Sequence, residues 1–363
     1  MELKGTNYEI GWKLGSLAAG IPQQKEAQTS NRVKLGEQDA LASKELFGRW
    51  CPGINEEIHG FADALNVPPD RIIYYAMTCL VPRCSHMAFL PGMTENGHVL
   101  VARSYEFCHR LEDFALARTC VTGKLAHIGT TILQFGRDEG MNECGLSVSM
   151  SSCGFPVGAE KQMRAPALRG LQFWAVVRTL LENCKDVEEA LLFLDGMPIA
   201  YNINLLLADK SGHAALVETM DGVRAIRKID GTTPQKFLYA ANHIMIPELL
   251  KYEPRAMAHS LKRSETIRKF ADGARAVSKE DLKSLLLTKY PEGLCCHYYD
   301  EFFGTTKSIV MDLNDGLLDL CWGGLAGNGW QVYTAGEPVE EREQPVGIRI
   351  EPSAPGIYDY VSL

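Results

Sequence analysis

Two apolar stretches joined by a polar turn constrain this chain more than any other feature. Residues 84–89 and 99–102 read as β-strands, and the turn between them contains an Asn-Gly pair, which is typical of a hairpin. The first strand begins with Cys84, and the second leads into Arg103 and Glu106. Because a hairpin returns the chain to its starting point, the sequence predicts a thiol, a guanidinium and a carboxylate near one end of the hairpin.

A thiol in this setting is a candidate nucleophile, because a nucleophile needs a nearby base and an electrostatic partner. If the peptide bond before Cys84 were cut, the new α-amine would lie beside its own thiol. Such an amine has a pKa of about 7.7–8.0 and can accept the thiol proton near neutral pH. The alternative is that Cys84 is one of 11 cysteines that mostly behave as small buried apolar residues.

Two further strand motifs follow in the sequence. Residues 138–150 combine a polar turn, which contains Asn142, with an alternating strand. Residues 202–212 form an apolar strand that carries Asn202 and Asn204 and runs into a second polar turn. These motifs add amide side chains to the thiol, the guanidinium and the carboxylate of the hairpin.

In this order the motifs resemble those of the N-terminal-nucleophile hydrolases of the choloylglycine hydrolase and acyl-coenzyme A:isopenicillin N (6-aminopenicillanic acid) acyltransferase type. The resemblance runs from about residue 73 to residue 334. Each matching element is weak alone, and the ordered set is a strong signal. The elements are the Cys84 strand and residues 103–106, 140–146, 204–212, 242–243, 260–263 and 305–308.

The resemblance implies a role for each site residue. Cys84 would be the nucleophile and its freed α-amine the base, with Arg103 and Glu106 orienting and tuning that pair. Asn142 and Asn204 would stabilise the oxyanion and orient the substrate, because preorganised amide donors face the charge that develops there. Arg263 would be the distal arginine of the site.

Each partner also has a structural alternative. Asn142 is equally well explained as a turn residue, and the two arginines as ordinary surface charges. Asn202 is a rival for Asn204, since the two lie two positions apart on a strand and share a face.

The chain departs from the family pattern at two places. The junction reads Arg83-Cys84-Ser85 where the acyltransferase branch usually has Gly-Cys-Thr, so self-cleavage between Arg83 and Cys84 is less certain. The familiar aspartate of the Arg-Asn-x-Asp element is replaced by Glu106, whose carboxylate is one methylene further from the backbone.

The implied activity is that of a zymogen that processes itself and then cleaves or transfers acyl groups at linear, non-peptide amide bonds through an acyl-thioester on Cys84. The expected partner is a small-molecule amide, with an acyl-coenzyme A donor if the enzyme is an acyltransferase. No cofactor is expected. A metal site is not expected either, because the run from Cys295 to His297 lacks the ligand spacing of a tetrahedral site.

Two other functions remain open. A papain-like cysteine protease would use Cys84 or Cys153 with a distant histidine, His243 or His297. A catalytically decayed binding or scaffold protein of the same fold would carry an unreactive Cys84 thiol.

Periodicity predicts an α+β chain, and the resemblance makes this a four-layer αββα sandwich. We expect a helical pro-segment or small subunit at residues 1–83 and a catalytic domain at residues 84–363. Strands are expected at residues 146–150, 203–208, 213–218, 222–228, 308–313 and 317–322. Helices are expected at residues 36–64 with a break at 51–53, and at 68–79, 165–184, 187–194, 257–272 and 278–288.

Composition narrows the function classes. The formal net charge is −8 with scattered basic residues, so no nucleic-acid surface is indicated. No stretch approaches the roughly 20 apolar residues of a membrane span, and the amino terminus lacks a signal-peptide core. An odd number of cysteines indicates reduced thiols and a cytoplasmic setting. The tail after residue 336 is expected to be loosely ordered or to form a homo-oligomer contact.

Overall fold

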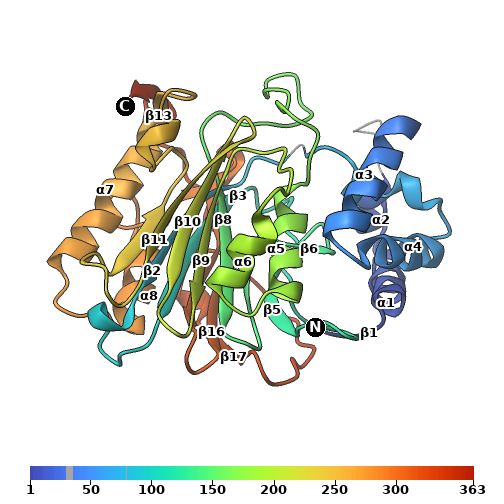
Figure 1. Cartoon of the computed structure of the whole chain (residues 1–363), viewed down its shortest axis with the longest axis horizontal. Helices are drawn as coiled ribbons and strands as arrows, with labels where there is room; N and C mark the ends of the chain where they lie inside the picture. Colours follow the sequence, from blue (N-terminus) through green and yellow to red (C-terminus); the bar gives the residue numbers. More distant parts are fainter. Residues whose placement is uncertain (30–35, 79) are drawn as a thin grey trace.

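The predicted hairpin forms the centre of one of two large β-sheets in this computed structural model, which describes residues 1–29, 36–78 and 80–363 (Figure 1). Strand β2 (Arg83–Phe89) pairs antiparallel with β3 (Leu100–Phe107), and Cys84 lies opposite Tyr105. The sheet has seven strands in the order β12-β2-β3-β15-β16-β17, with β14 paired to β15. The other strands are β12 (Phe237–Ala240), β14 (His297–Tyr298), β15 (Phe303–Asp312), β16 (Leu317–Trp322) and β17 (Gln331–Thr334).

The second sheet has nine strands in the order β1-β4-β5-β7-β8-β9-β10-β11, with β6 paired to β5. Its neighbours are antiparallel except for β1 and β4. The strands are β1 (Glu2–Gly5), β4 (Leu116–Val121), β5 (His127–Ile132), β6 (Gly136–Arg137), β7 (Glu139–Asn142), β8 (Leu146–Ser152), β9 (Ile203–Asp209), β10 (Ala214–Met220) and β11 (Val223–Ile229).

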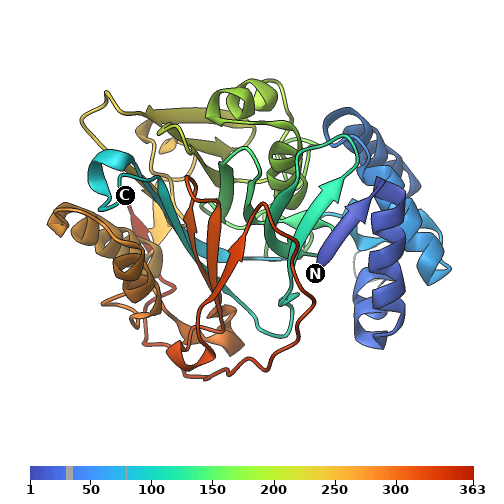
Figure 2. The same ribbon diagram turned by 90° about the horizontal axis from the view of Figure 1, so that it is seen from below.

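Three apolar layers hold the sheets and helices together (Figure 2). One layer, which includes Leu206 and Val101, lies between the two sheets. A second joins the nine-stranded sheet to α5 (Phe173–Asn183) and α6 (Val187–Leu194), and a third joins the seven-stranded sheet to α7 (Ala258–Gly273) and α8 (Lys279–Leu287). The chain is therefore α+β and has the helix-sheet-sheet-helix order that was predicted.

The described part of the amino-terminal segment contains four α-helices, and they lie beside the sandwich (Figure 1). Close packing of α1 on α4 depends on glycine, because a Cβ at Gly15 would lie 2.5 Å from the Phe61 carbonyl oxygen. The segment also supplies β1, whose Glu2 lies opposite Arg118 of the nine-stranded sheet. No strand was predicted at these residues. The helices are α1 (Asn7–Ala19), α2 (Pro22–Thr29), α3 (Glu37–Trp50) and α4 (Ile54–Leu65).

Two expected helices differ from the structure. Helix α5 begins at Phe173 rather than at residue 165, since Pro166 and Gly170 disfavour helix before it. The helix expected over 68–79 is instead two short 3₁₀ turns, Pro69–Arg71 and Ile73–Tyr75, separated by extended backbone at Ile72. Cys79, at the end of that range, lies outside the described residues.

The tail beyond residue 336 has no helix or strand before β18 (Tyr360–Ser362), which pairs with β13 (Arg255–Met257). It is nevertheless tied to the rest of the chain, as where the Ser353 amide donates to Glu301 at 2.8 Å. None of the helices in the described parts of the chain combines the length and the apolar character that crossing a membrane requires.

Candidate active site

Cys84 stands near the start of β2 with its side chain completely buried. Its face of the sheet also carries Arg103, because Cys84 pairs with Tyr105 and residues two apart on β3 share a face. Arg103 is buried as well, and its Nη2 donates to the Cys84 Sγ at 3.1 Å. The structure therefore brings the predicted thiol and guanidinium into direct contact.

Arg103 is itself held by acidic groups at the start of β7. Its Nε lies 3.2 Å from the Glu139 Oε2, and its Nη1 donates to the carbonyl oxygen of Asp138. The Asp138 carboxylate also lies 3.0 Å from the Lys307 Nζ, and this lysine in turn lies 3.2 Å from Glu112. A buried network of alternating charges thus extends from the thiol into the space between the sheets. The sequence analysis singled out Arg103 but not the other members.

Burial controls the protonation of this network. It raises the pKa of the Cys84 thiol to about 12, and the Arg103 charge offsets only part of that effect. Burial, with the neighbouring Asp138, also raises the pKa of Glu139 to about 7. In this structure Cys84 is therefore a neutral thiol at physiological pH, so a reaction at this residue needs an acceptor for the thiol proton.

The backbone nitrogen of Cys84 has a separate partner. It donates to the Asn242 Oδ1 at 3.2 Å, and the same oxygen accepts from the Arg263 Nη2 at 2.6 Å. Asn242 follows β12, the edge strand beside β2, and its Nδ2 donates to the Ser152 carbonyl at 2.9 Å. Asn242 belonged to the matching motifs, but it was not assigned a role at the Cys84 nitrogen.

Glu106 and Arg263 form a buried ion pair on the opposite face of the seven-stranded sheet. Glu106 pairs across the strands with Arg83, so its side chain does not share the face of Cys84. The Arg263 Nη1 lies 3.2 Å from the Glu106 Oε2 and donates to the Ser85 Oγ at 2.7 Å. Burial raises the pKa of Glu106 although Arg263 opposes the shift. Both residues therefore reach Cys84 through Asn242 and the backbone rather than by touching the thiol.

Asn142 has the contacts of a turn residue. Its Nδ2 donates to the carbonyls of Leu181 and Cys184 at 3.0 and 2.7 Å. Its Oδ1 accepts from the amides of Cys144 and Leu146, both at 3.1 Å. Because both donor hydrogens are already engaged, the structure favours the turn alternative over the oxyanion role.

Asn204 and Asn202 have different hydrogen-bond partners in the structure. Asn202 bridges a turn, accepting from the Asp221 amide at 2.9 Å. The Asn204 Nδ2 donates to Ser151 at 3.2 Å and to the Ala241 carbonyl, next to Asn242, at 3.1 Å. Of the two rivals, Asn204 lies with the groups around the Cys84 nitrogen.

The two histidines of the papain-like alternative are engaged elsewhere. The His243 Nδ1 is 2.8 Å from the Ser260 Oγ, and burial lowers the pKa of this ring to about 4. The His297 Nε2 is 3.7 Å from the Cys295 Sγ. Burial is the main cause that raises the pKa of the Cys153 thiol, and the nearby carboxylates of Glu218 and Glu253 raise it further. The described contacts thus pair neither histidine with Cys84 or Cys153, and the thiol beside His297 is that of Cys295.

One group of described side chains has the spacing of metal ligands. It consists of His98, Asp312 and Asp315, in the turns at the far ends of β3 and β15 from Cys84. The His98 Nδ1 already lies 3.0 Å from the Asp312 Oδ1 and 3.7 Å from Asp315. Both carboxylates thus already contact the His98 ring, and we assign the group no chemistry.

The sandwich with a candidate nucleophile at the start of a strand defines the protein class as that of the N-terminal-nucleophile hydrolases. The sequence model of the family described as acyl-coenzyme A:6-aminopenicillanic acid acyl-transferase matches residues 93–326, and the chain belongs to this family. Its members are acyltransferases and related amidohydrolases, so the protein is an enzyme of that kind. No curated protein matches the sequence significantly.

Solved structures with some similarity include two hydrolases. Penicillin V acylase from Agrobacterium tumefaciens is 18% identical with a TM-score of 0.44, over 66% of this chain and 83% of that one. A variant of conjugated bile acid hydrolase from Clostridium perfringens is 13% identical with a TM-score of 0.46, over 74% of this chain and 99% of that one.

Proposed function

We propose that the protein is a self-processing cysteine enzyme that cleaves or transfers acyl groups at linear, non-peptide amide bonds. The observation that carries the proposal is that Cys84 has two separate partners. Its thiol lies 3.1 Å from Arg103, and its nitrogen lies 3.2 Å from Asn242. An enzyme that uses both the thiol and the amine of one residue needs this arrangement. The family match begins at residue 93, so the role of Cys84 rests on this geometry and on the motif order.

Processing would begin with attack of the Cys84 Sγ on the carbonyl carbon of Arg83. The C–N bond breaks, the nitrogen takes the thiol proton, and a thioester links Arg83 to Cys84. Water then hydrolyses the thioester, which leaves a carboxylate on Arg83 and frees both the thiol and the α-amine of Cys84. The new amine would keep Asn242 as its hydrogen-bond partner and becomes the missing base.

Processing would also make room for a substrate. In the uncut chain the residues just before Cys84, including Leu80, Val81 and Pro82, line two hollows of about 20 and 10 Å³. These hollows are far smaller than the 300–1,000 Å³ of typical ligand sites. Withdrawal of the segment after cleavage would open space beside the thiol, which is the behaviour of a zymogen.

In the mature enzyme the amine would take the thiol proton, and the thiolate would attack the substrate carbonyl. Arg103 would stabilise the thiolate. Asn204 is the proposed donor to the oxyanion, for which its Nδ2 would exchange its present contact with Ser151 or Ala241 for the substrate oxygen. The ammonium of Cys84 would return its proton to the leaving amine, which leaves an acyl-thioester. Water or a second amine would then take the acyl group from Cys84, which completes hydrolysis or transfer. In a transfer reaction, an acyl-coenzyme A thioester could load Cys84 in place of the amide.

The proposed division of the chain follows from the cleavage site. Residues 1–83 would remain as a small subunit, and residues 84–363 would form the catalytic domain. We propose the cytoplasm as the setting, since the ten described cysteines are all free thiols.

The test is the intact mass of freshly purified protein, with Cys84→Ala and Cys153→Ala beside wild type. We expect fragments of residues 1–83 and 84–363 from wild type and from Cys153→Ala, and a single chain from Cys84→Ala. Cys153 is the matched control because it is also a buried cysteine. An uncut wild-type chain, whose Cys84 reacts with iodoacetamide no faster than its other thiols, would instead favour the decayed alternative.

The contacts also predict opposite outcomes for two asparagines. Asn242→Ala should lower kcat/KM by about tenfold to a hundredfold, since it removes the acceptor that holds the Cys84 nitrogen. Asn142→Ala should lower the melting temperature and leave kcat/KM of the remaining folded enzyme nearly unchanged. Steady-state kinetics and thermal melts of the two variants measure the contrast. A large loss of kcat in folded Asn142→Ala would restore its oxyanion role.

A further inference from the structure

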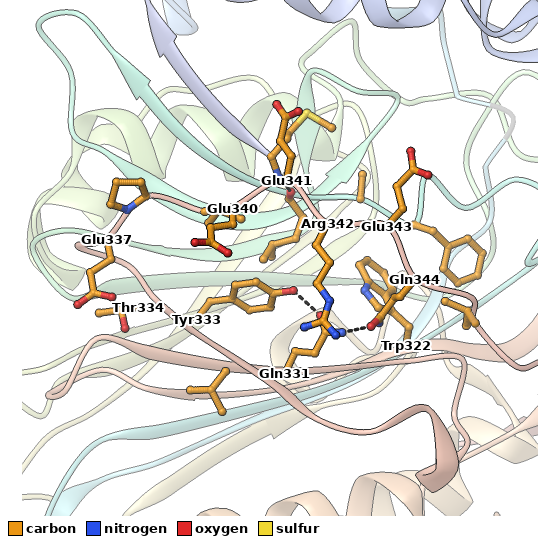
Figure 3. A pocket seen from close by; sticks show the side chains of 18 of the residues that line it. Trp322, Gln331, Tyr333, Thr334, Glu337, Glu340, Glu341, Arg342, Glu343 and Gln344 are labelled. Atoms are coloured by element: carbon orange, nitrogen blue, oxygen red, sulfur yellow. Dashed lines mark hydrogen bonds between the residues drawn. The ribbon is translucent and has the colours of Figure 1, made fainter.

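A cavity of about 830 Å³ lies where edges of the two sheets meet the carboxy-terminal tail, and it shares no lining residue with the two hollows lined by the segment before Cys84. Its walls come from β17 at the edge of one sheet, from residues 114–116 at the start of β4 in the other, and from residues 337–346 of the carboxy-terminal tail (Figure 3). We call this tail segment the strap. The volume falls within the range of small-molecule sites.

The cavity and the Cys84 centre are separate places on the same sheet. Strand pairing runs from Cys84 to Tyr105, then to Lys307, and finally to Trp322, which lines the cavity. Three strand spacings place the cavity about 14 Å from the thiol. Tyr105 and Lys307 are buried between them, with the Lys307 Nζ 4.1 Å from the Tyr105 ring centre. A ligand in the cavity therefore would not touch Cys84.

The floor of the cavity is apolar and aromatic. Trp322, Leu116 and Val339 are buried members of the layer between the sheets, and Phe114 and Tyr333 pack against them. The rings of Phe114 and Trp322 are 5.5 Å apart, tilted by 56°. Such a floor suits an apolar or aromatic body.

Two side chains of opposite charge extend from the strap over this floor. In Figure 3 the side chains of Glu340 and Arg342 extend from the strap toward Tyr333 and Gln331, whereas those of Glu341 and Glu343 point the other way. This alternation is what an extended chain produces, since residues two apart share a face. Across the described ranges neither Glu340 nor Arg342 forms an ion pair, whereas Glu341 pairs with Lys13 at 3.2 Å.

Hydrogen bonds fix the strap on either side of Glu340 and Arg342. The Val339 amide donates to the Glu2 Oε2 at 3.1 Å, and the Gly347 amide donates to the Asn328 Oδ1 at 2.9 Å. Below the strap, the Tyr333 hydroxyl donates to Gln331, whose amide donates to Gln344. The carboxylate and the guanidinium are thus carried by a tethered segment facing an aromatic floor.

We propose that this cavity binds a zwitterionic amino compound with an apolar body, such as an aromatic amino acid. Its ammonium group pairs with Glu340, its carboxylate pairs with the Arg342 guanidinium, and its side chain lies over Trp322 and Phe114. Glu340 and Arg342 are both exposed to solvent, so a ligand can reach both of them. A ligand with both charges forms two charge-assisted hydrogen bonds there, whereas a simple cation or anion forms one. The site is independent of the thiol chemistry proposed for Cys84.

The test is calorimetric titration of the full chain with three probes that share one apolar body. L-Phenylalanine carries both charges, phenethylamine only the cation, and 3-phenylpropanoate only the anion. We expect phenylalanine to bind at least tenfold more tightly than either analogue. Glu340→Gln should weaken phenylalanine and phenethylamine about tenfold and leave 3-phenylpropanoate unchanged, and Arg342→Gln should show the reverse selectivity.

The matched control is Glu343→Gln, which removes the same charge from the same strap on a side chain that points away. It should leave all three affinities unchanged. The proposal is overturned if phenylalanine does not bind at millimolar concentration, if the three probes bind alike, or if Glu343→Gln has the same effect as Glu340→Gln. Because the readout is binding at the strap, failure here and failure of self-cleavage at Cys84 are distinguishable.

Discussion

Replacing Arg103 with methionine is expected to slow the reaction of Cys84 with iodoacetamide by about tenfold to a thousandfold at fixed pH. The reason is that an opposite charge within about 4–6 Å lowers the pKa of an acid by about 1–3, and Arg103 lies 3.1 Å from the Sγ. Without it the pKa of the thiol rises from its present value of about 12, and the thiolate fraction falls tenfold for each unit of that rise. Amide-cleaving activity should fall in parallel.

The sign of the pH dependence gives a second readout of the same contact. Burial places the pKa of Cys84 at about 12 before cleavage, so in uncut protein, identified by its intact mass, the alkylation rate should rise about tenfold per pH unit between pH 7 and 10. Arg103→Met should keep this slope at a lower rate, and Arg103→Lys should restore part of the rate. Arg137→Met is the control, since it also removes a buried arginine, but one bonded to Thr119 at 2.6 Å. Equal rates in Arg103→Met and wild type would remove Arg103 from the site.

The hairpin and the α+β class were predictable because local patterns encode them, whereas the order of the four layers was predicted from the family resemblance. Two apolar stretches and the Asn-Gly turn between them predict the pairing of β2 with β3, and helical spacing predicts α3, α4 and α6 nearly to their ends. Strand β1 was not predictable, because four residues at the amino terminus carry no periodic signal and pair with a strand that begins at Leu116. Its placement depends on tertiary contacts alone.

Some contacts of the candidate site were likewise predictable from the sequence, and others were not. The contact between Cys84 and Arg103 follows from the register of one hairpin, which a sequence can indicate. The acceptor of the Cys84 nitrogen is the side-chain oxygen of Asn242, which lies 158 residues away just after the neighbouring strand β12, and only the motif order pointed to it. The position of Glu106 on the other face also follows from register, since it is three residues from Arg103 rather than two or four. Whether a carboxylate and a thiol lie on the same face of a sheet therefore follows from the strand register and not from their separation in the sequence.

A buried ion pair joins the amino-terminal segment to the catalytic part of the chain. Glu57 of α4 lies 2.7 and 2.6 Å from the two terminal nitrogens of Arg178 in α5. Arg178 also contacts Glu182 at 2.8 Å, and Asn7 donates to Glu57 at 3.0 Å. Because Glu57 is fully buried, this contact would hold residues 1–83 in place after cleavage at Arg83.

Glu57→Gln is therefore expected to lower the free energy of unfolding by about 3 kcal/mol. The reason is that the buried Arg178 guanidinium would lose one of its carboxylate partners. Urea denaturation measures this best in the Cys84→Ala background, where the chain stays in one piece. Glu56→Gln, one residue away and exposed, is the matched control and should change stability by less than about 0.5 kcal/mol. In cleaved wild type, gel filtration should show both fragments eluting together, and Glu57→Gln should release the smaller one. If the two variants were equally stable, the attachment of the segment would have to rest on its apolar contacts and on β1 rather than on this ion pair.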